Sequence, residues 1–138
     1  MFERYTELGR RSIYFAHYEA SAFLSPEIST EALLLGILRE DPRVGLALGT
    51  GAVEAIRKEL EPLASKGERI SPPVDLPLTM EAKSALEYAT EEADALDHKM
   101  IDTPHLVLGL LRVEGCLAAT LLRRHGLDYK QYRDARGR

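Results

Sequence analysis

Apolar residues recur along this chain at helical spacing. After residue 79 they return every three or four positions, at Ala82, Ala85, Leu86, Ala89, Ala93 and Leu96. Such spacing places the side chains on one face of a helix, and Thr79 is suited to cap its N-terminus. Thr6 holds the same position before a first helix, so each half of the chain begins with an amphipathic helix.

The pattern occurs twice in the chain. Residues 28–41 read ISTEALLLGILRED and residues 101–114 read IDTPHLVLGLLRVE. At a constant offset of 73 residues, twelve of the 34 positions from 6 to 39 are identical. The identical pairs begin at Thr6, Ala16, Glu19, Ala20, Ala22, Ile28, Thr30, Leu33, Leu35, Gly36, Leu38 and Arg39. This is an internal duplication, with too few copies for a solenoid.

The two repeated stretches predict the most buried helix of each half. These helices begin at Thr30 and Thr103, and Pro104 takes the first-turn position that proline favours. Gly36 and Gly109 interrupt them at equivalent places, although glycine costs about 1 kcal/mol relative to alanine in a helix. Their recurrence predicts close helix packing, with contact across the two halves as one possibility.

Shorter helices complete each half. The pattern predicts helices at about 44–49 and 117–125, and further ones at about 52–65 and 128–136. Residues 65–78, SKGERISPPVDLPL, hold three prolines and a glycine, which favour a linker. We predict one all-α domain of two four-helix repeats, about 2–65 and 78–136, joined by a linker at about 66–77 and related by a pseudo-twofold axis.

Composition limits the number of domains and the cellular compartment that we expect for this chain. Hydrophobic residues make up 45% of the 138, enough for a core in one domain. The longest apolar runs are too short for a bilayer, which needs about 20 residues, and the charged N-terminus does not resemble a signal peptide. The single cysteine, Cys116, excludes an internal disulfide and fits a reducing cytoplasm. We expect a cytoplasmic protein without a membrane partner.

Charge argues against a general nucleic-acid binder, because the formal net charge is −4. Basic residues nevertheless gather between 123 and 138, where a solvated helix end is favoured over a binding arm. A helix-turn-helix is disfavoured too, since the repeated helix is too apolar to present base-reading side chains. A helical nucleic-acid-binding regulator remains an unlikely alternative.

Candidate catalytic and cofactor motifs are missing. GTGAVE at 49–54 has Glu54 where a phosphate-binding loop needs glycine, and a strand does not precede it. Cys116 is expected to be a small buried hydrophobe rather than a nucleophile. The carboxylates of EYATEEADALD, 87–97, are expected to form a solvated helix face.

The four histidines do not form a metal site in the sequence. They are His17, His98, His105 and His125, without an HExxH pattern or a cysteine partner. We expect partly exposed histidines, no metal, no cofactor and no enzyme.

The repeated stretches carry a resemblance. STEALLLGILRE and DTPHLVLGLLRVE resemble the signature GTEHLLLGLLRE, found twice in the N-terminal domain of bacterial Clp ATPases, especially those of the ClpC type. MFERYTELGRRSIYFAHYEA resembles that family's first helix, LPLTMEAKSALEYATEEADALDH its fifth, and AATLLRRHGLD the start of its last helical pair. The resemblance covers essentially the whole chain.

The resemblance implies a double four-helix module that hydrolyses nothing. It implies docking of adaptor proteins and protein substrates for a Clp ATPase, an unfoldase that feeds a protease or a disaggregation channel. Two forms stay open: part of a full ATPase, or a free-standing adaptor, modulator or decoy.

The resemblance also implies a phosphoarginine site. In ClpC-type domains the glutamate after the threonine of each signature binds the guanidinium of phosphoarginine. Here the first copy keeps it as Glu31 and the second has Pro104, so Thr6, Thr30 and Glu31 are candidate site residues and recognition is expected to be one-sided or absent. The alternative for Glu31 is a helix-dipole role, since a first-turn acid contributes about 0.3–1 kcal/mol.

A second surface implied by the resemblance is apolar. Phe2 and Leu78 match a hydrophobic docking patch, although Phe2 alternatively covers the core. The remaining candidates are expected to be the structural signature of the repeat: Gly36, Arg39, Thr103, Gly109 and Arg112.

Overall fold

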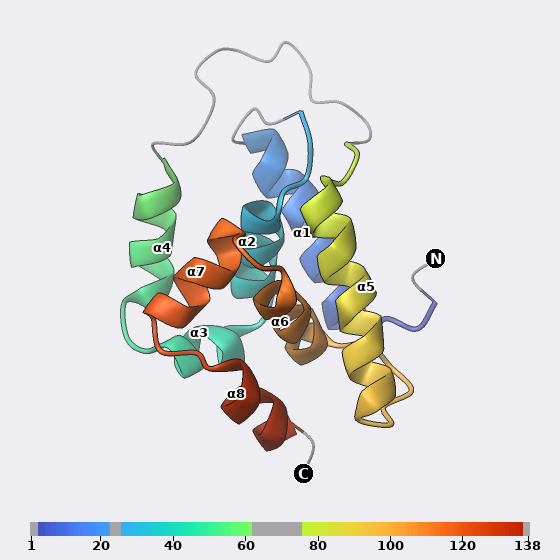
Figure 1. Cartoon of the computed structure of the whole chain (residues 1–138). Coiled ribbons are helices and arrows are strands. Elements are labelled where there is room, and N and C mark those ends of the chain that lie inside the picture. The colour runs from blue at the N-terminus through green and yellow to red at the C-terminus, as the bar shows by residue number, and fades with distance from the viewer. Residues whose placement is uncertain (1–2, 23–25, 62–75, 137–138) are drawn as a thin grey trace.

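The computed structural model describes residues 3–22, 26–61 and 76–136, and in these ranges the chain forms eight α-helices. Figure 1 shows their arrangement. The helices are α1 (Glu7–Ala22), α2 (Thr30–Glu40), α3 (Pro42–Leu48), α4 (Ala52–Leu60), α5 (Met80–Ala95), α6 (Thr103–Arg112), α7 (Leu117–Arg124) and α8 (Tyr129–Arg136). The predicted all-α fold of two four-helix repeats is confirmed.

Helix boundaries agree closely with the sequence pattern, with one early start. The repeated helices begin at Thr30 and Thr103 as predicted, capped by the side chains of Ser29 and Asp102. Helix α3 begins at Pro42, before the predicted residue 44, because Asp41 accepts from the Arg43 N–H and caps it. Most of the predicted linker at 66–77, and the predicted helix end at 65, lie outside the described residues. The predicted repeat boundaries stay predictions.

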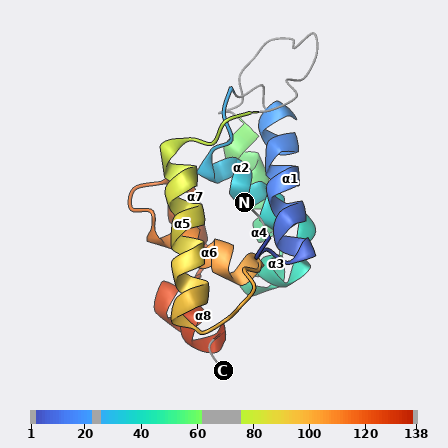
Figure 2. The ribbon, with the colours of Figure 1, turned by 90° about the vertical axis from the view of Figure 1, so that its right-hand side faces the viewer.

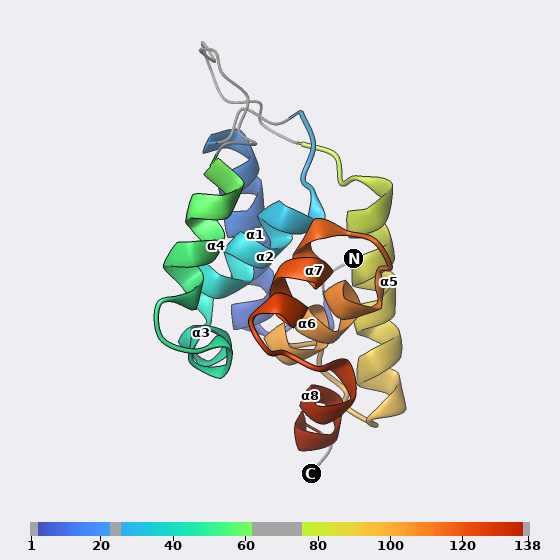
Figure 3. The same ribbon diagram turned by 60° about the vertical axis from the view of Figure 1, so that its left-hand side comes forward.

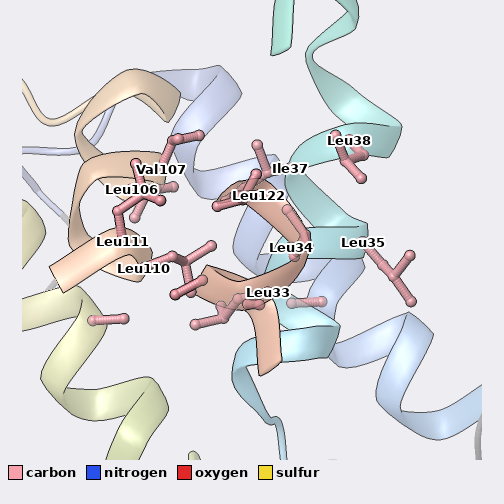
Figure 4. Close-up of a cluster of buried hydrophobic side chains, with 14 of the residues drawn as sticks. Leu33, Leu34, Leu35, Ile37, Leu38, Leu106, Val107, Leu110, Leu111 and Leu122 are labelled. Carbon is pink, nitrogen blue, oxygen red and sulfur yellow. The ribbon is translucent and has the colours of Figure 1, made fainter. Parts of the chain in front are cut away.

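The repeated helices α2 and α6 form the centre of the molecule. Most residues of both are buried, as the leucine-rich pattern predicts. Figure 4 shows Leu34 and Ile37 of α2 and Leu110 of α6 gathered around Leu122 of α7. Figure 3 shows α7 passing in front of both central helices, so it closes the core between the halves.

The two signature glycines allow α1 and α5 to lie against the central helices. A Cβ atom on Gly36 would lie 2.2 Å from the carbonyl oxygen of Ser12 in α1. One on Gly109 would lie 2.2 Å from the carbonyl oxygen of Ala85 in α5. The predicted close packing is therefore present, but it lies within each half. At both glycines the nearest atoms belong to the first helix of the same half and not to the other half.

Short pairings cross between the halves. Tyr5 forms an isolated parallel bridge with Ile101, and Ile28 forms one with Leu78. Under the 73-residue offset Tyr5 corresponds to Leu78 and Ile28 to Ile101, so the two bridges exchange under the duplication. This exchange is the signature of the predicted pseudo-twofold axis. It also places the residues before α1 beside those before α6, and the residues before α5 beside those before α2.

Candidate functional site

The candidate site threonine Thr6 and its counterpart Thr79 lie at these crossings. The Thr6 N–H donates to the Ile101 carbonyl (3.0 Å) and its hydroxyl donates to Asp102 Oδ1 (2.7 Å). In the other half the Thr79 N–H donates to the Ile28 carbonyl (3.0 Å). Thr6 therefore contacts the second repeated stretch. The first repeated stretch, which contains Glu31, is contacted by Thr79 instead.

The first repeated helix has a half-buried acid beside a buried threonine. Thr30 is buried, and its hydroxyl donates to Glu31 Oε1 at 2.8 Å. The Ser29 side chain accepts from the Ala32 N–H at 3.2 Å and caps the helix. Glu31 itself is half-buried, so the residue is partly accessible at the helix N-terminus. A carboxylate in this position can pair with a guanidinium, while nearby N–H groups favour an anion.

Two further carboxylates lie at the N-terminus of the second repeated helix, α6. Asp102 accepts from the Thr6 hydroxyl and from the Thr103 N–H (2.8 Å), and the Thr103 hydroxyl donates to the buried Asp41. Asp41 also accepts from the Arg43 guanidinium at 2.8 and 2.9 Å. Burial raises the pKa of Asp41, but these hydrogen bonds outweigh burial and hold the pKa below its usual value.

The two helix ends thus differ in chemistry. At the second end Pro104 lacks an N–H and a carboxylate, and Asp41 holds the Thr103 hydroxyl. At the first end the threonine hydroxyl is held by Glu31, which remains half-exposed. Only the first end therefore offers an accessible acid directly after the signature threonine.

An apolar pocket lies beside Leu78. It has a volume of about 420 Å³ and is lined by Leu78, by Leu86, Glu87, Thr90 and Lys83 of α5, and by Glu3, Arg4, Tyr5 and Ile101. Burial raises the pKa of Tyr5 to about 12. The walls are apolar and the rim carries charges of both signs, as is usual for a docking site. Phe2, the other predicted patch residue, lies outside the described residues.

Two buried glutamates correct the expectation of a solvated carboxylate face. Glu92 is buried, accepts from Arg112 at 3.1 Å and accepts from the Tyr129 hydroxyl at 2.6 Å. Its counterpart Glu19 is also buried and accepts from Arg57 at 2.6 and 3.2 Å. Both carboxylates point inward because arginines reach them from neighbouring helices.

The signature arginines lie over aromatic rings as well as beside these glutamates. The Arg39 guanidinium is 4.3 Å from the Phe15 ring centroid and 4.0 Å from Glu19. Arg112 lies 4.2 Å from the Tyr88 ring centroid in the equivalent place. These positions bind α1 to α2 and α5 to α6.

Two histidines form a pair that the sequence did not reveal. His105, expected to be partly exposed, is buried, and its Nδ1 accepts from the Asp102 N–H at 2.9 Å, which completes a capping box. Its Nε2 lies 2.8 Å from His98 Nδ1. Because His105 Nδ1 is an acceptor, the hydrogen must be on Nε2, which donates to His98. Burial and the neighbouring His98 lower the pKa of His105. His17, His98 and His125 are half-buried, which agrees with the expectation for them.

Other candidate chemistry is not assembled in the described ranges. Cys116 is buried and caps α7, with its Sγ accepting from the Ala119 N–H, which fits the predicted structural role. Residues 3–22, 26–61 and 76–136 contain no group of three metal-binding side chains. Within the same ranges no single helix is long and apolar enough to cross a bilayer, and α6 with α7 meets that test only as a pair bent by 107°.

The basic residues near the end of the chain are largely engaged within the molecule. Arg123 donates to the Leu111 carbonyl at 3.0 Å, and Arg124 forms an ion pair with Glu59. In α8 the Arg136 guanidinium lies 4.8 Å from the Tyr132 ring centroid. These contacts tie part of the basic segment to the rest of the domain, and the choice between a solvated helix end and a binding arm stays a prediction.

Comparison with known proteins places these features in context. Residues 77–137 match the family model described as the Clp repeat (R) N-terminal domain. The chain is 34% identical over 137 residues to the negative regulator of genetic competence ClpC/MecB of Bacillus subtilis, covering 96% of this chain and 16% of the relative. It is 36% identical over 132 residues to the chloroplastic chaperone protein ClpC of Pisum sativum, covering 93% of this chain and 14% of the relative.

Solved structures show the same likeness in three dimensions. The N-terminal domain of the chaperone ClpD from Arabidopsis thaliana is 30% identical, with a TM-score of 0.74, and the match covers 98% of this chain and 93% of that one. The Hsp104 N-terminal domain from Candida albicans is 15% identical with a TM-score of 0.71, covering 96% of this chain and 88% of that one, and shares the fold. The chain spans about a sixth of the length of the curated relatives it matches.

Proposed function

The chain belongs to the Clp N-terminal domain family, and from that membership we propose that it is a non-catalytic module that docks adaptor proteins or protein substrates for a Clp-type ATP-dependent unfoldase. The observation that carries the proposal is the pocket beside Leu78. Apolar walls from Leu78, Leu86 and Ile101 lie under a rim of mixed charge. Such a pocket suits an apolar side chain flanked by polar backbone, which is what an adaptor or an unfolded segment presents.

Two forms of this function remain to be separated. The chain can act as the N-terminal part of a Clp ATPase, or as a free-standing adaptor or modulator of one. The length of the open reading frame that encodes the chain separates the two. We place the protein in the cytoplasm, although several relatives carry chloroplastic names.

Affinity capture with a pocket variant tests the docking function. Thr90→Arg fills the pocket from α5, where the half-buried threonine donates only to its own helix, to the Leu86 carbonyl. Thr120→Arg is the matched control, since Thr120 is exposed on α7 and likewise donates to its own helix. We expect a Clp ATPase or one of its adaptors to be captured from the native lysate by the unchanged chain and by Thr120→Arg, and to be lost with Thr90→Arg.

Two results would contradict this proposal. Capture that survives Thr90→Arg places docking elsewhere on the domain. Capture of neither an ATPase nor an adaptor sets the docking function aside. A salt-dependent shift of DNA at micromolar protein would instead favour the nucleic-acid alternative.

Phosphoarginine recognition at Glu31 is a narrower second proposal. It is favoured by the half-exposed carboxylate at the N-terminus of α2, beside Thr30 and across from Thr79. The second helix end carries Pro104 and holds its threonine with Asp41, so recognition is expected at one site only.

A further inference from the structure

The connection between α5 and α6 forms part of the wall of the pocket beside Leu78. Figure 2 shows this connection leaving the lower end of α5 and rising to the start of α6. Ile101, near the end of the connection, lines the pocket together with Arg4 and Tyr5 from the segment before α1. The Ile101 N–H donates to the Arg4 carbonyl at 2.8 Å, and the Ile101 carbonyl accepts from the Thr6 N–H at 3.0 Å. The shape of this wall therefore depends on how the connection is held.

An arginine and a pair of histidines hold the connection in place. The Arg4 guanidinium donates to the Lys99 carbonyl at 3.0 Å and to the His98 carbonyl at 3.3 Å. The buried His105 accepts from the Asp102 N–H at 2.9 Å, and its Nε2 lies 2.8 Å from His98 Nδ1. The histidine pair thus ties the connection to α6 at two points.

The hydrogen-bond pattern of the pair leaves no place for a further proton without breaking one of these ties. While both rings are neutral, the two accepting nitrogens are His105 Nδ1 and His98 Nδ1. A proton on His105 Nδ1 displaces the Asp102 N–H. A proton on His98 Nδ1 faces the hydrogen of His105 Nε2, and moving that hydrogen to His105 Nδ1 displaces the Asp102 N–H again. Uptake of one proton from solvent therefore releases the connection in either case.

Charged groups of the neighbouring elements surround the pair and set where it titrates. Burial first, and then the His98 charge, lower the pKa of His105 from 6.5, against smaller opposite effects of Asp102 and Glu92. The proton is therefore taken up below about pH 6.5. The groups around the pair and its connection are Arg4 before α1, Asp41 at the end of α2, Arg43 of α3, Glu92 and Asp94 of α5, Asp102, Arg112 of α6 and Tyr129 of α8.

The first half of the duplication has a cap that does not respond to pH. Under the 73-residue offset Asp102 corresponds to Ser29 and His105 to Ala32. The Ser29 hydroxyl caps α2 by accepting from the Ala32 N–H at 3.2 Å, and neither group titrates near neutral pH. Of the two caps, the one next to the pocket wall is therefore the one that a proton can open.

We propose that the His98–His105 pair is a pH switch for the pocket beside Leu78. With both rings neutral, the connection is held and Ile101 keeps its place in the wall. When the pair takes up a proton, the Asp102 N–H is released, the wall loosens and the pocket holds an apolar side chain less tightly. This inference rests on the docking function proposed above, because it concerns the same pocket. Since only the neutral pair is competent to bind, the apparent Kd rises by up to about tenfold for each pH unit below the midpoint of the titration.

Nuclear magnetic resonance of the full chain tests the switch, with N-acetylphenylalaninamide as a probe that is neutral throughout. Between pH 7 and pH 5 the amide of Asp102 and the methyl groups of Ile101 should shift with the same midpoint as the His105 ring. The probe, titrated at both pH values, should bind more weakly at the lower one. Circular dichroism at each pH confirms that the chain stays folded.

Three variants make the test specific. His105→Gln keeps an oxygen that can accept from the Asp102 N–H but cannot take up the proton, so both pH effects should disappear. Thr120→Gln, at an exposed site on α7, should keep both effects. Thr90→Arg fills the pocket and should prevent probe binding at either pH, which shows that the probe occupies this pocket.

Three results would overturn the switch. Methyl groups of Ile101 that stay fixed while His105 titrates would show that the proton does not act on the pocket wall. Equal probe affinity at pH 7 and pH 5 would show that the wall does not control binding. A response that persists in His105→Gln would assign it to the rim carboxylates Glu3 and Glu87.

Failure of the switch and failure of the docking function can be told apart. Partner capture that survives Thr90→Arg sets aside docking at this pocket, while the methyl shifts of Ile101 still report whether the histidine pair moves the wall. If the methyl groups do not respond but capture at pH 7 is lost with Thr90→Arg, the docking function stands and the switch is wrong.

Discussion

Gly36 lies so close to Ser12 that a Cβ atom on the glycine would be 2.2 Å from the serine carbonyl oxygen. The second half repeats this relationship between Gly109 and Ala85, also at 2.2 Å. Because the obstacle is backbone rather than a flexible side chain, neither helix can yield without shifting as a whole. The glycines of the repeated stretches are therefore contact points where α1 and α5 approach the central helices.

Alanine at either glycine should destabilise the fold. Gly36→Ala and Gly109→Ala gain helix propensity of about 1 kcal/mol, but overpacking against backbone costs about 1–3 kcal/mol or more. We expect a net loss of about 1–2 kcal/mol in the free energy of unfolding, measured by urea denaturation. Gly45→Ala is the control, because its Cβ would meet only the Val53 side chain at 3.1 Å. Equal stability of Gly36→Ala and Gly45→Ala would show that the approach is looser than this.

The sequence predicted the core more fully than the polar contacts. Leucines and glycines of the repeats were predictable because burial and helical spacing act locally along the chain. The pairing of Glu19 with Arg57 was not, since the arginine comes from α4 and depends on tertiary packing. A signal was present, however: Glu19 and Glu92 are identical across the duplication, whereas the exposed Tyr14 and Glu87 differ.

Part of the candidate site was predicted from the sequence, but its contacts between the two halves were not. Glu31 could be singled out because it follows a repeated threonine, and Pro104 marked the asymmetry. That Thr6 contacts Asp102 of the opposite half could not be predicted, because the contact depends on how the two halves pack together and not on local sequence. His105 was misjudged because its two hydrogen-bond partners lie in the loop that precedes α6.

Arg57→Ala should reveal the cost of the buried Glu19 carboxylate. Breaking a buried ion pair costs about 3–5 kcal/mol, and the partial exposure of the Arg57 side chain reduces this to about 2 kcal/mol through solvent screening. Arg39→Ala should cost less, about 1 kcal/mol, because Arg39 lies 4.0 Å from Glu19 while Arg57 stays at 2.6 Å. Urea denaturation of each variant provides the comparison.

A double-mutant cycle separates this ion pair from lost packing. Glu19→Gln in the Arg57→Ala background removes the unpaired charge and should recover part of the stability. If the losses from the two substitutions simply add, the carboxylate and the guanidinium do not interact in solution.

The His98–His105 pair should make stability depend on pH. A second proton on His105 would have to go to Nδ1, which already accepts from the Asp102 N–H, because Nε2 carries the hydrogen that it donates to His98. Burial first, and then the His98 charge, lower the pKa of His105 from 6.5 in the folded state, against smaller opposite effects of Asp102 and Glu92. The unfolded chain therefore binds more protons below about pH 6.5. The stabilising contribution is complete above that pH and is lost as the pH falls toward the folded pKa.

His105→Gln isolates the effect. Glutamine at this position can still accept from the Asp102 N–H, so the capping box is kept while the titrating ring is removed. We expect the free energy of unfolding of this variant to fall less steeply between pH 7 and pH 5, by up to about 1.4 kcal/mol per pH unit. Thr120→Gln, at an exposed site on α7 that carries no titrating group, should leave the slope unchanged. An unaltered slope in His105→Gln would assign the pH dependence to other groups.

Phosphoarginine should bind at one site that requires Glu31. The free amino acid is titrated into the chain by calorimetry, and a weak isotherm with a stoichiometry of one is expected, because only α2 presents an accessible acid after its signature threonine. Glu31→Ala should abolish the binding heat by removing the partner of the guanidinium. Glu54→Ala is the control, since Glu54 is likewise an acid in the first turn of a helix, α4, although it is more exposed than Glu31. This variant should bind phosphoarginine as the unchanged chain does. Two equal sites, or binding that persists in Glu31→Ala, would leave Glu31 with the helix-dipole role alone, and that role would appear as a loss of about 0.3–1 kcal/mol in stability without any change in ligand binding.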